Sequence, residues 1–106
     1  MIVETLDKLN AKVFTGQLHT RFKVHVGNPG PVELELTEVN ERTTSPKVEL
    51  FSLIFRGPVT PRLVQRIHPL EHDSLGKFEL FLTPVGLDEN GTLYEAVFHR
   101  LAKPQP

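Results

Sequence analysis

The sequence contains no cysteine and no tryptophan, and it has no long apolar run. Without cysteine there can be no disulfide, no thiolate metal ligand and no cysteine nucleophile. No stretch approaches the about 20 apolar residues that a membrane-spanning helix needs, so we expect no membrane insertion. The start of the chain, Met1 to Thr5, looks too short and too acidic for a signal peptide, so we expect none. These features fit a reducing cytoplasm, although cysteine-free secreted proteins also exist.

The chain also lacks an excess of charge of either sign. It has 12 lysine and arginine residues against 13 aspartate and glutamate residues, and a formal net charge of -1. A dedicated nucleic-acid binder needs a strong basic excess to hold phosphates, and an anionic membrane surface attracts polybasic patches. We therefore expect neither of these partners. The length of 106 residues fits a single domain over 1–106 with one modest core.

Three segments carry apolar residues at both alternating sets of positions: Phe51–Phe55, Phe78–Leu82 and Tyr94–Phe98. Side chains alternate between the two faces of a strand, so a strand over one core needs only one apolar set. A second set needs a second place of burial. In a chain of this length, that place is the wall of a closed barrel, a covering segment or another protein chain.

The N-terminal region has the pattern of one short helix. Apolar residues at positions 6, 9, 13 and 14 have the spacing of an amphipathic helix. Thr5 is a candidate N-cap and Gly16 a natural end, so the pattern predicts a helix over 6–14 that plugs one end of a sheet. At the other terminus, the proline-bearing residues 102–106 are expected to form a frayed tail.

The clearest β unit is a hairpin around residues 27–31. Apolar residues at 22, 24 and 26 and at 32, 34 and 36 alternate with polar ones on either side of this turn. The expected register pairs residue 26 with 32, 24 with 34 and 22 with 36, and it places His25 opposite Glu33 and Lys23 opposite Glu35. A slip by one residue would bury the charged set, so we expect the register to be well specified.

The remaining pattern predicts four more strands. We expect a loop over 38–46 and then a strand over 47–56. An extended piece follows over 63–72, with Pro69 at an edge or bulge. A fifth strand should run from 75 to about 84–86, and a hairpin turn over Asp88–Gly91 should connect it to a sixth strand over 92–101. The sum is an all-β fold, a six-stranded antiparallel meander that forms a small barrel or a sandwich, with one short N-terminal helix.

The five histidines are the residues that most invite a site hypothesis. His68 and His72 are four positions apart, which on a strand separates their rings by ~13 Å, at ~3.3 Å per residue, too far for one metal ion. His72 precedes the turn Asp73–Gly76, and its imidazole is expected to bond to a carbonyl of that turn and so to join the fourth strand to the fifth. Nothing in the sequence assembles a catalytic, metal or cofactor site, so we expect no enzyme and no cofactor.

Several short blocks, in this order and spacing, are similar to one known family: Val32–Val39, Phe51–Pro58, Leu63 with Gln65, Leu70–His72, Leu75–Gly76, Leu80–Leu82, Pro84–Gly86 and Tyr94–Phe98. Over roughly residues 5–99 the chain resembles a family of small bacterial proteins, a domain of unknown function encoded beside phage tail-collar proteins of the microcystin-dependent-protein type. It departs from that family's pattern at Arg66, His68 and Asp73. The resemblance implies a component, assembly factor or chaperone of a tail-fibre-like or surface-appendage system.

The function expected from these observations is a non-enzymatic protein–protein interaction module. Its partner would be a tail-collar or fibre-like protein, or further copies of the chain, and it would act in the cytoplasm or after export within a fibre or virion-like assembly. The residues expected at the partner surface are Phe51, Leu53, Phe55, Arg56 and Phe81, although a closed barrel would hide the phenylalanines. The alternative is a barrel that holds a small apolar ligand; an enzyme that uses a histidine is the third reading.

Overall fold

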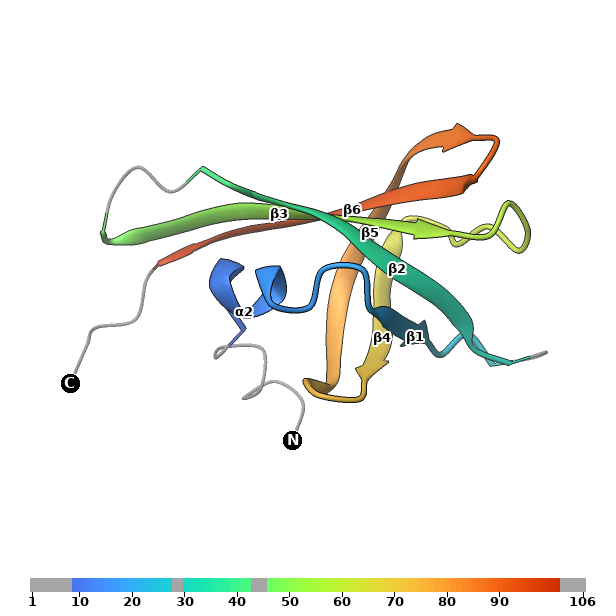
Figure 1. Cartoon of the computed structure of the whole chain (residues 1–106), viewed down its shortest axis with the longest axis horizontal. Helices are drawn as coiled ribbons and strands as arrows, with labels where there is room; N and C mark the ends of the chain where they lie inside the picture. The colour runs from blue at the N-terminus through green and yellow to red at the C-terminus, as the bar shows by residue number, and fades with distance from the viewer. Residues whose placement is uncertain (1–8, 28–29, 43–45, 102–106) are drawn as a thin grey trace.

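The computed structural model describes residues 9–27, 30–42 and 46–101, which form one short helix and six strands (Figure 1). The elements are the helix α2 (Ala11–Thr15) and the strands β1 (Arg21–Val24), β2 (Val32–Glu41), β3 (Val48–Gly57), β4 (Arg66–His72), β5 (Gly76–Asp88) and β6 (Gly91–Leu101). The predicted all-β fold with one short helix is confirmed. Within the described ranges, no helix has the length and apolar character of a membrane span.

All six strands are antiparallel and form a closed barrel in the order β1-β2-β3-β6-β5-β4. Of the two architectures that the sequence left open, the structure is the barrel. The chain builds it from two three-stranded meanders, β1 to β3 and β4 to β6. Because β3 pairs with β6 and β1 with β4, the strand order is not sequential where the segment 58–65 connects the two meanders.

The two seams between the meanders differ in length. β3 and β6 pair along their whole length, from Val48 opposite Leu101 to Gly57 opposite Thr92. β1 and β4 pair only through two neighbouring positions of each strand, residues 23–24 with 70–71. One further hydrogen bond of 2.9 Å continues this seam, from the His25 N–H to the Pro69 carbonyl.

Pro69 lies inside the closed sheet rather than at an open edge. The N–H and C=O positions of one residue in an antiparallel strand face the same neighbouring strand. Since the Pro69 carbonyl accepts from His25, the donor that proline lacks also faces this side, where β1 has already ended. The missing hydrogen bond therefore falls at the end of the short seam.

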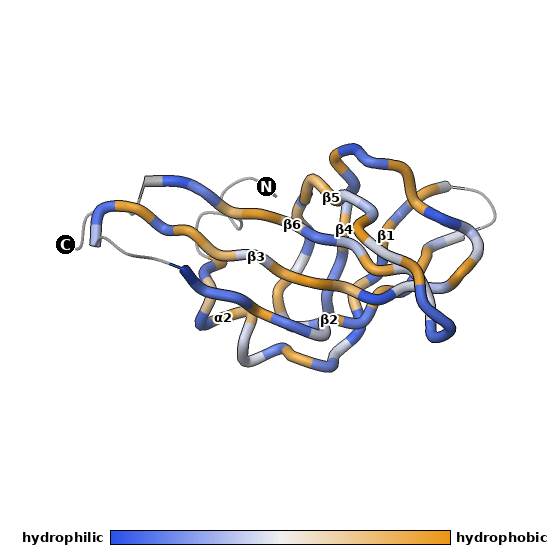
Figure 2. Tube along the Cα trace, turned by 90° about the horizontal axis from the view of Figure 1, so that it is seen from above, coloured by the Kyte–Doolittle hydropathy of each residue, from blue (hydrophilic) through white to orange (hydrophobic). Residues whose placement is uncertain are grey.

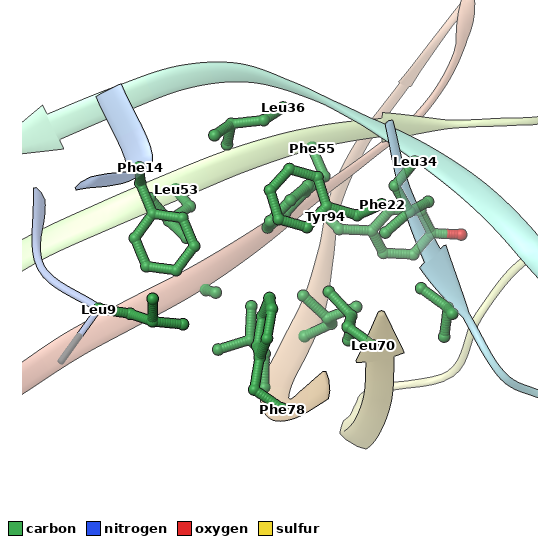
Figure 3. Packing of buried hydrophobic residues seen from close by; sticks show 14 of the residues in the cluster. Leu9, Phe14, Phe22, Leu34, Leu36, Leu53, Phe55, Leu70, Phe78 and Tyr94 are labelled. Carbon is green, nitrogen blue, oxygen red and sulfur yellow. The ribbon is translucent and has the colours of Figure 1, made fainter. Parts of the chain in front are cut away.

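Phe14 joins the helix to the barrel core, as Figure 3 shows. Its ring is fully buried, and its centroid lies 5.8 Å from that of Phe98, 6.3 Å from those of Phe51 and Phe78, and 6.5 Å from that of Phe22. These four neighbours come from four different strands. Burial of one phenylalanine side chain stabilises the fold by roughly 1.5–3 kcal/mol, so this contact is a substantial reason for the short helix to dock.

The helix is shorter than the sequence pattern predicts. It begins at Ala11, because Asn10 is its N-cap and accepts from the Val13 N–H at 2.9 Å, and its C-cap is Gly16, the predicted end. The predicted helical start over 6–8 and the Thr5 cap lie outside the described residues, as does the predicted tail over 102–106. Leu9 precedes the helix and still packs into the core.

The first hairpin forms, but its predicted register is wrong by two residues. The structure pairs Val24 with Val32, Phe22 with Leu34, Lys23 with Glu33 and Arg21 with Glu35. A shift of two keeps the side chains of the paired strands on their predicted faces, so Phe22, Val24, Val32, Leu34 and Leu36 remain inside. The charged partners change: His25 contacts Glu71 on β4 instead of Glu33, and Val26 lies beyond β1 and is exposed.

Two strands extend further than predicted. β2 runs to Glu41 through the predicted loop over 38–46, with a register shift between Leu36 and Glu38. β5 runs to Asp88, with a second shift between Pro84 and Gly86 where we expected the strand to end. Such register shifts let a strand bend and continue its pairing, as β-bulges do.

The two-faced strands place one apolar set inside and leave the other on the outer wall. Figure 2 shows β3 as a largely hydrophobic strand, yet only its alternate residues Phe51, Leu53, Phe55 and Gly57 are buried. In the outer set, Phe81 of β5 is 51% exposed and Val97 of β6 is 60% exposed. The surplus apolar side chains are thus only partly hidden by closure of the barrel.

Candidate functional site

Three of the residues expected at a partner surface lie in the core instead. Phe51 is 2% exposed, and Leu53 and Phe55 are fully buried within the barrel. This corrects the prediction for these three residues, because the ring closure turns their face of β3 inward. Phe51 stacks on Phe98 with ring centroids 4.5 Å apart, which makes both rings part of the packing.

Phe81 and Arg56 lie on the outside, in different surroundings. Phe81 is exposed and pairs across the strands with Ile67, which is 56% exposed on the same outer wall. Arg56 is only partly exposed and donates to the Asp88 carboxylate at 3.0 Å. Arg56 therefore joins β3 to the end of β5, and Phe81 with Ile67 forms an apolar pair that no described side chain covers.

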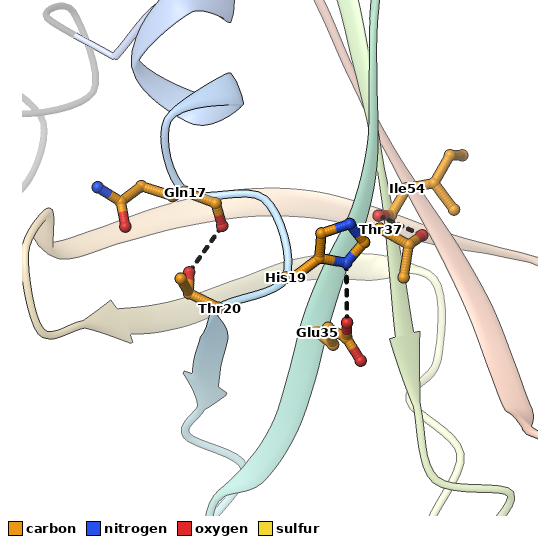
Figure 4. A network of polar contacts seen from close by, with 6 residues as sticks. All are labelled: Gln17, His19, Thr20, Glu35, Thr37 and Ile54. Carbon is orange, nitrogen blue, oxygen red and sulfur yellow. Dashed lines mark hydrogen bonds and ion pairs between the residues drawn. The ribbon is translucent and has the colours of Figure 1, made fainter.

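The histidines do not converge on one point. His19 lies 3.1 Å from a carboxylate oxygen of Glu35, in the polar contacts drawn in Figure 4. His25 contacts Glu71 at 2.9 Å, and this hydrogen bond lowers the pKa of the Glu71 carboxyl. Among the residues that the structure describes, no group of three histidine or acidic side chains could hold a metal ion.

His72 is buried and bonds to the turn that follows it, but to backbone N–H groups of the turn rather than to the predicted carbonyl. Its Nδ1 accepts from the backbone N–H groups of Ser74 at 3.0 Å and Leu75 at 3.2 Å, so this nitrogen carries no proton. Its Nε2 must then carry the proton and donate to the Thr20 hydroxyl at 2.8 Å. Thr20 in turn donates to the Gln17 carbonyl (Figure 4). His72 therefore connects the β4–β5 turn to the start of β1.

The outer wall is hollowed beside Ile67. A cleft of about 480 Å³ lies between the segment 61–64 and the beginning of β4, close to the end of β1. Its lining is apolar or basic: Val26, Pro61, Leu63, Val64, Ile67 and Pro69, with Arg62, Arg66, His25 and His68. We call this the Ile67 cleft. A second hollow of about 530 Å³ lies beside the β1–β2 hairpin, where Glu33 and Glu35 face Arg21 and Arg56.

Two hydrogen bonds to core side chains hold one wall of the Ile67 cleft. The Leu63 N–H donates to the hydroxyl of the buried Tyr94 at 2.8 Å. The Val64 carbonyl accepts from Nε2 of His68 at 2.8 Å, and His68 is only 5% exposed. These two hydrogen bonds from buried side chains therefore hold the backbone between Arg62 and Ile67 in place, although this stretch belongs to no strand until residue 66.

The two arginines of the Ile67 cleft have no acidic partner among the residues that the structure describes. Neither Arg62 nor Arg66 makes an ion pair or a side-chain hydrogen bond with any other part of the chain that the structure describes. No acidic residue is among the lining residues. The neighbouring carboxylate of Glu71 is engaged by His25. The cleft is thus a positive hollow with an apolar floor.

Sequence reasoning identified Phe81 but missed the cleft beside it. Val64, Arg66 and Ile67 lie in a stretch that was expected only to be extended chain interrupted by Pro69. The sequence pattern that involves them is the alternation of Arg66 and His68 with Ile67. This pattern predicts the strand, but it does not predict how the segment 58–65 packs beside the strand to form the cleft. That packing depends on the distant hydroxyl of Tyr94.

Comparison with known proteins gives one match. A family model described as a domain of unknown function (DUF6916) covers residues 9–98. No curated protein and no solved structure matches the chain. The matched residues span β1 to β5 and nearly all of β6, so the chain belongs to this family of domains of unknown function, DUF6916.

Proposed function

We propose that this chain is a non-enzymatic protein–protein interaction module that binds its partner through the outer wall of β4 and β5. The observation that carries the proposal is the pair Ile67 and Phe81, which lie side by side and are each more than half exposed. Large apolar side chains that are exposed together mark interaction surfaces more often than isolated ones do. Aromatic residues at such positions also supply much of the binding energy of protein interfaces.

The side chains that could have served chemistry support this reading. His68 and His72 are occupied by backbone groups, and His19 and His25 pair with surface carboxylates. A general base needs a reactive partner within hydrogen-bond reach, and each of these histidines instead contacts a group that stabilises the fold. Their arrangement therefore favours a structural role.

The biological setting of the module comes from the family resemblance alone. A tail-collar or fibre-like protein is the partner that this resemblance implies, with the chain as a component, an assembly factor or a chaperone. Further copies of the chain are the other partner that the exposed pair could serve. Either partner would contact the same two residues, Ile67 and Phe81.

The test compares two aspartate substitutions at exposed apolar positions. The tagged chain is co-purified with the products of its neighbouring genes, and bound proteins are identified by mass spectrometry. Phe81→Asp should release the partner, because a charge at the contact must be desolvated on binding. Val97→Asp is the matched control, since Val97 is also exposed but lies on β6 outside this pair.

Light scattering at several protein concentrations tests self-association with the same two variants. A chain that stays monomeric at every concentration and retains no neighbouring gene product would contradict the proposal. Equal loss of the partner in both variants would mean that the contact is not centred on Phe81.

The alternative function, a barrel that holds a small apolar ligand, has less support. Rings fill the barrel: Phe22 lies 5.2 Å from Phe55 and 6.2 Å from Phe78, measured between centroids. The two hollows described above open at the surface, beside charged side chains. An apolar ligand would have to displace core side chains, and loss of such packing costs several kcal/mol.

A further inference from the structure

We propose that the Ile67 cleft binds an acidic, apolar segment of a protein partner, with Arg62 and Arg66 as the groups that hold its carboxylates. This inference rests on the proposed function and adds to it the chemistry of the partner. The segment would place an aspartate or glutamate beside a medium-sized apolar side chain, because the cleft offers both kinds of contact within one hollow.

The charge of the cleft selects an anion. Both arginines are exposed, line the hollow and have no acidic partner within the described ranges. Elsewhere on the barrel, Arg21 and Arg56 each have a carboxylate within 4.0 Å. A guanidinium group presents several donors in a planar fork and binds carboxylates with two parallel hydrogen bonds. Two such groups beside one hollow form a surface complementary to acidic side chains.

The floor of the cleft selects an apolar neighbour for that acid. Val64 is 64% exposed and Ile67 is 56% exposed, so both offer apolar area that a ligand can cover. Ile67 pairs with Phe81, which continues this floor along the outer wall beyond the cleft. Burial of apolar area contributes about 25 cal/mol per Å², and it needs no precise ligand geometry.

The wall of the cleft is prepared before a ligand arrives. Tyr94 and His68, both buried, hold the backbone at Leu63 and Val64. Arg62 directly precedes this fixed stretch, and Arg66 begins β4. Groups held in place by the fold lose less conformational entropy when they bind a ligand. Tyr94 and His68 are therefore positioning residues for the two arginines.

A protein segment fits these features better than a nucleic acid does. The net charge of the chain is -1, and phosphate backbones are held by many cations rather than by two. The lining of the cleft includes no phenylalanine or tyrosine on which bases would stack. A nucleic acid remains an outcome that the experiment can detect.

The experiment selects ligands from a displayed library of random peptides on the intact chain. We expect enriched peptides to contain aspartate or glutamate next to valine, leucine, isoleucine or phenylalanine. The strongest is synthesised with a fluorescent label and titrated by anisotropy. Arg62→Glu and Arg66→Glu should each weaken its binding about tenfold or more, because each reverses a charge at the contact. Arg42→Glu is the matched control, since Arg42 is an exposed arginine that follows β2 and lies outside the cleft.

Each outcome decides the inference. Enriched peptides that are neutral or basic, or that bind equally well to Arg66→Glu and Arg42→Glu, would overturn it. Competition by a random single-stranded oligonucleotide that exceeds competition by the acidic peptide would assign the cleft to nucleic acid. If Phe81→Asp releases a cellular partner while Arg62→Glu and Arg66→Glu retain it, the interaction module stands and the acidic ligand does not.

Discussion

At the scale of single residues, His72 is a neutral ring that the fold uses as both donor and acceptor. Its Nδ1 accepts two backbone N–H groups, and its Nε2 donates to Thr20. The ring also packs against Phe22, with centroids 4.3 Å apart. A protonated imidazole has no acceptor nitrogen. Protonation of His72 would therefore place an N–H at Nδ1, directly facing the backbone N–H groups of Ser74 and Leu75.

The free energy of unfolding should therefore fall in acid. Burial lowers the pKa of His72 below its ordinary value of 6.5, and the carboxylate of the neighbouring Asp73 opposes this shift only in part. A group whose folded pKa is depressed contributes stability that is present above its unfolded pKa and is lost as the pH falls below it. Urea unfolding followed by circular dichroism should show a lower midpoint at about pH 5 than at about pH 7.5.

His72→Asn is the variant that separates this ring from the other histidines. The asparagine oxygen can accept from the turn N–H groups at either pH, so the difference between the two midpoints should shrink. The exposed pairs His19 with Glu35 and His25 with Glu71 remain in this variant. An unchanged pH dependence would show that these pairs, and not His72, dominate it.

Tyr94 tests whether the wall of the cleft depends on a core hydroxyl. Tyr94→Phe removes the acceptor of the buried Leu63 N–H and should lower the free energy of unfolding by about 1–3 kcal/mol. The Leu63 amide should also exchange its hydrogen faster, as measured by NMR. The Phe14 amide, which donates to Asn10 in the helix, is the internal control. Faster exchange at both amides would indicate general loosening instead.

At the scale of elements, the end of the β5–β6 hairpin depends on one close contact. Gly91 has φ +143°, and a Cβ built on it would lie 2.0 Å from the Gly57 carbonyl oxygen. Gly91 begins β6, and Gly57 ends β3, directly before the segment 58–65. The backbones of the two strand ends therefore meet where only glycine fits.

Gly91→Ala should lower the free energy of unfolding by at least about 2 kcal/mol, because backbone strain and the clash with Gly57 act together. Gly30→Ala is the matched control: Gly30 has a φ of +152°, and a Cβ added there would meet no atom within 4 Å. It should cost only the strain, about 1 kcal/mol. Equal midpoints in urea for the two variants would contradict the role of the contact.

The elements also show what a sequence pattern can predict. Alternation between Phe22 and Leu36 marks two strands and their inner face, and both are confirmed except at Val26, which lies beyond β1 and is exposed. It does not determine the register, because a shift of two residues buries the same side chains. The hydrogen bond of His25 with Glu71 could not be predicted, since it depends on contact between the two meanders.

The candidate binding surface, too, could be predicted from the sequence only in part. The pattern of Phe78–Leu82 shows two apolar sets, and Phe81 is indeed exposed. In Phe51–Phe55 the set of Phe51, Leu53 and Phe55 is the more apolar one, and the partner prediction chose this set, which the barrel buries. Only closure of the sheet decides which face of β3 is inside. The Ile67 cleft needs in addition the path of 58–65, which no local pattern specifies.

At the scale of the whole molecule, the long seam and the short seam should differ in stability. β3 and β6 pair along their full length, whereas β1 and β4 share only residues 23–24 and 70–71. Local opening costs less free energy where fewer hydrogen bonds and buried contacts must break. The short seam should therefore open first.

Native-state hydrogen exchange at increasing urea concentrations measures this order. The His25 amide, which donates to Pro69, should exchange through a low-energy opening that precedes global unfolding. Amides of Leu53 and Ala96, which are opposite each other in the long seam, should exchange only with global unfolding. Identical exchange free energies at both seams would mean that the barrel opens as one unit.

The path of the chain through the barrel has a practical consequence. The segment 58–65 is the only covalent link between two halves of three strands each, and it also forms one wall of the cleft. A gene divided there would encode two fragments that can reassemble along the full β3–β6 interface. Because His25 and Val26 of the first fragment line the cleft beside residues of the second, a peptide that contacts both fragments would favour their reassembly, and a split reporter fused to them would detect that peptide.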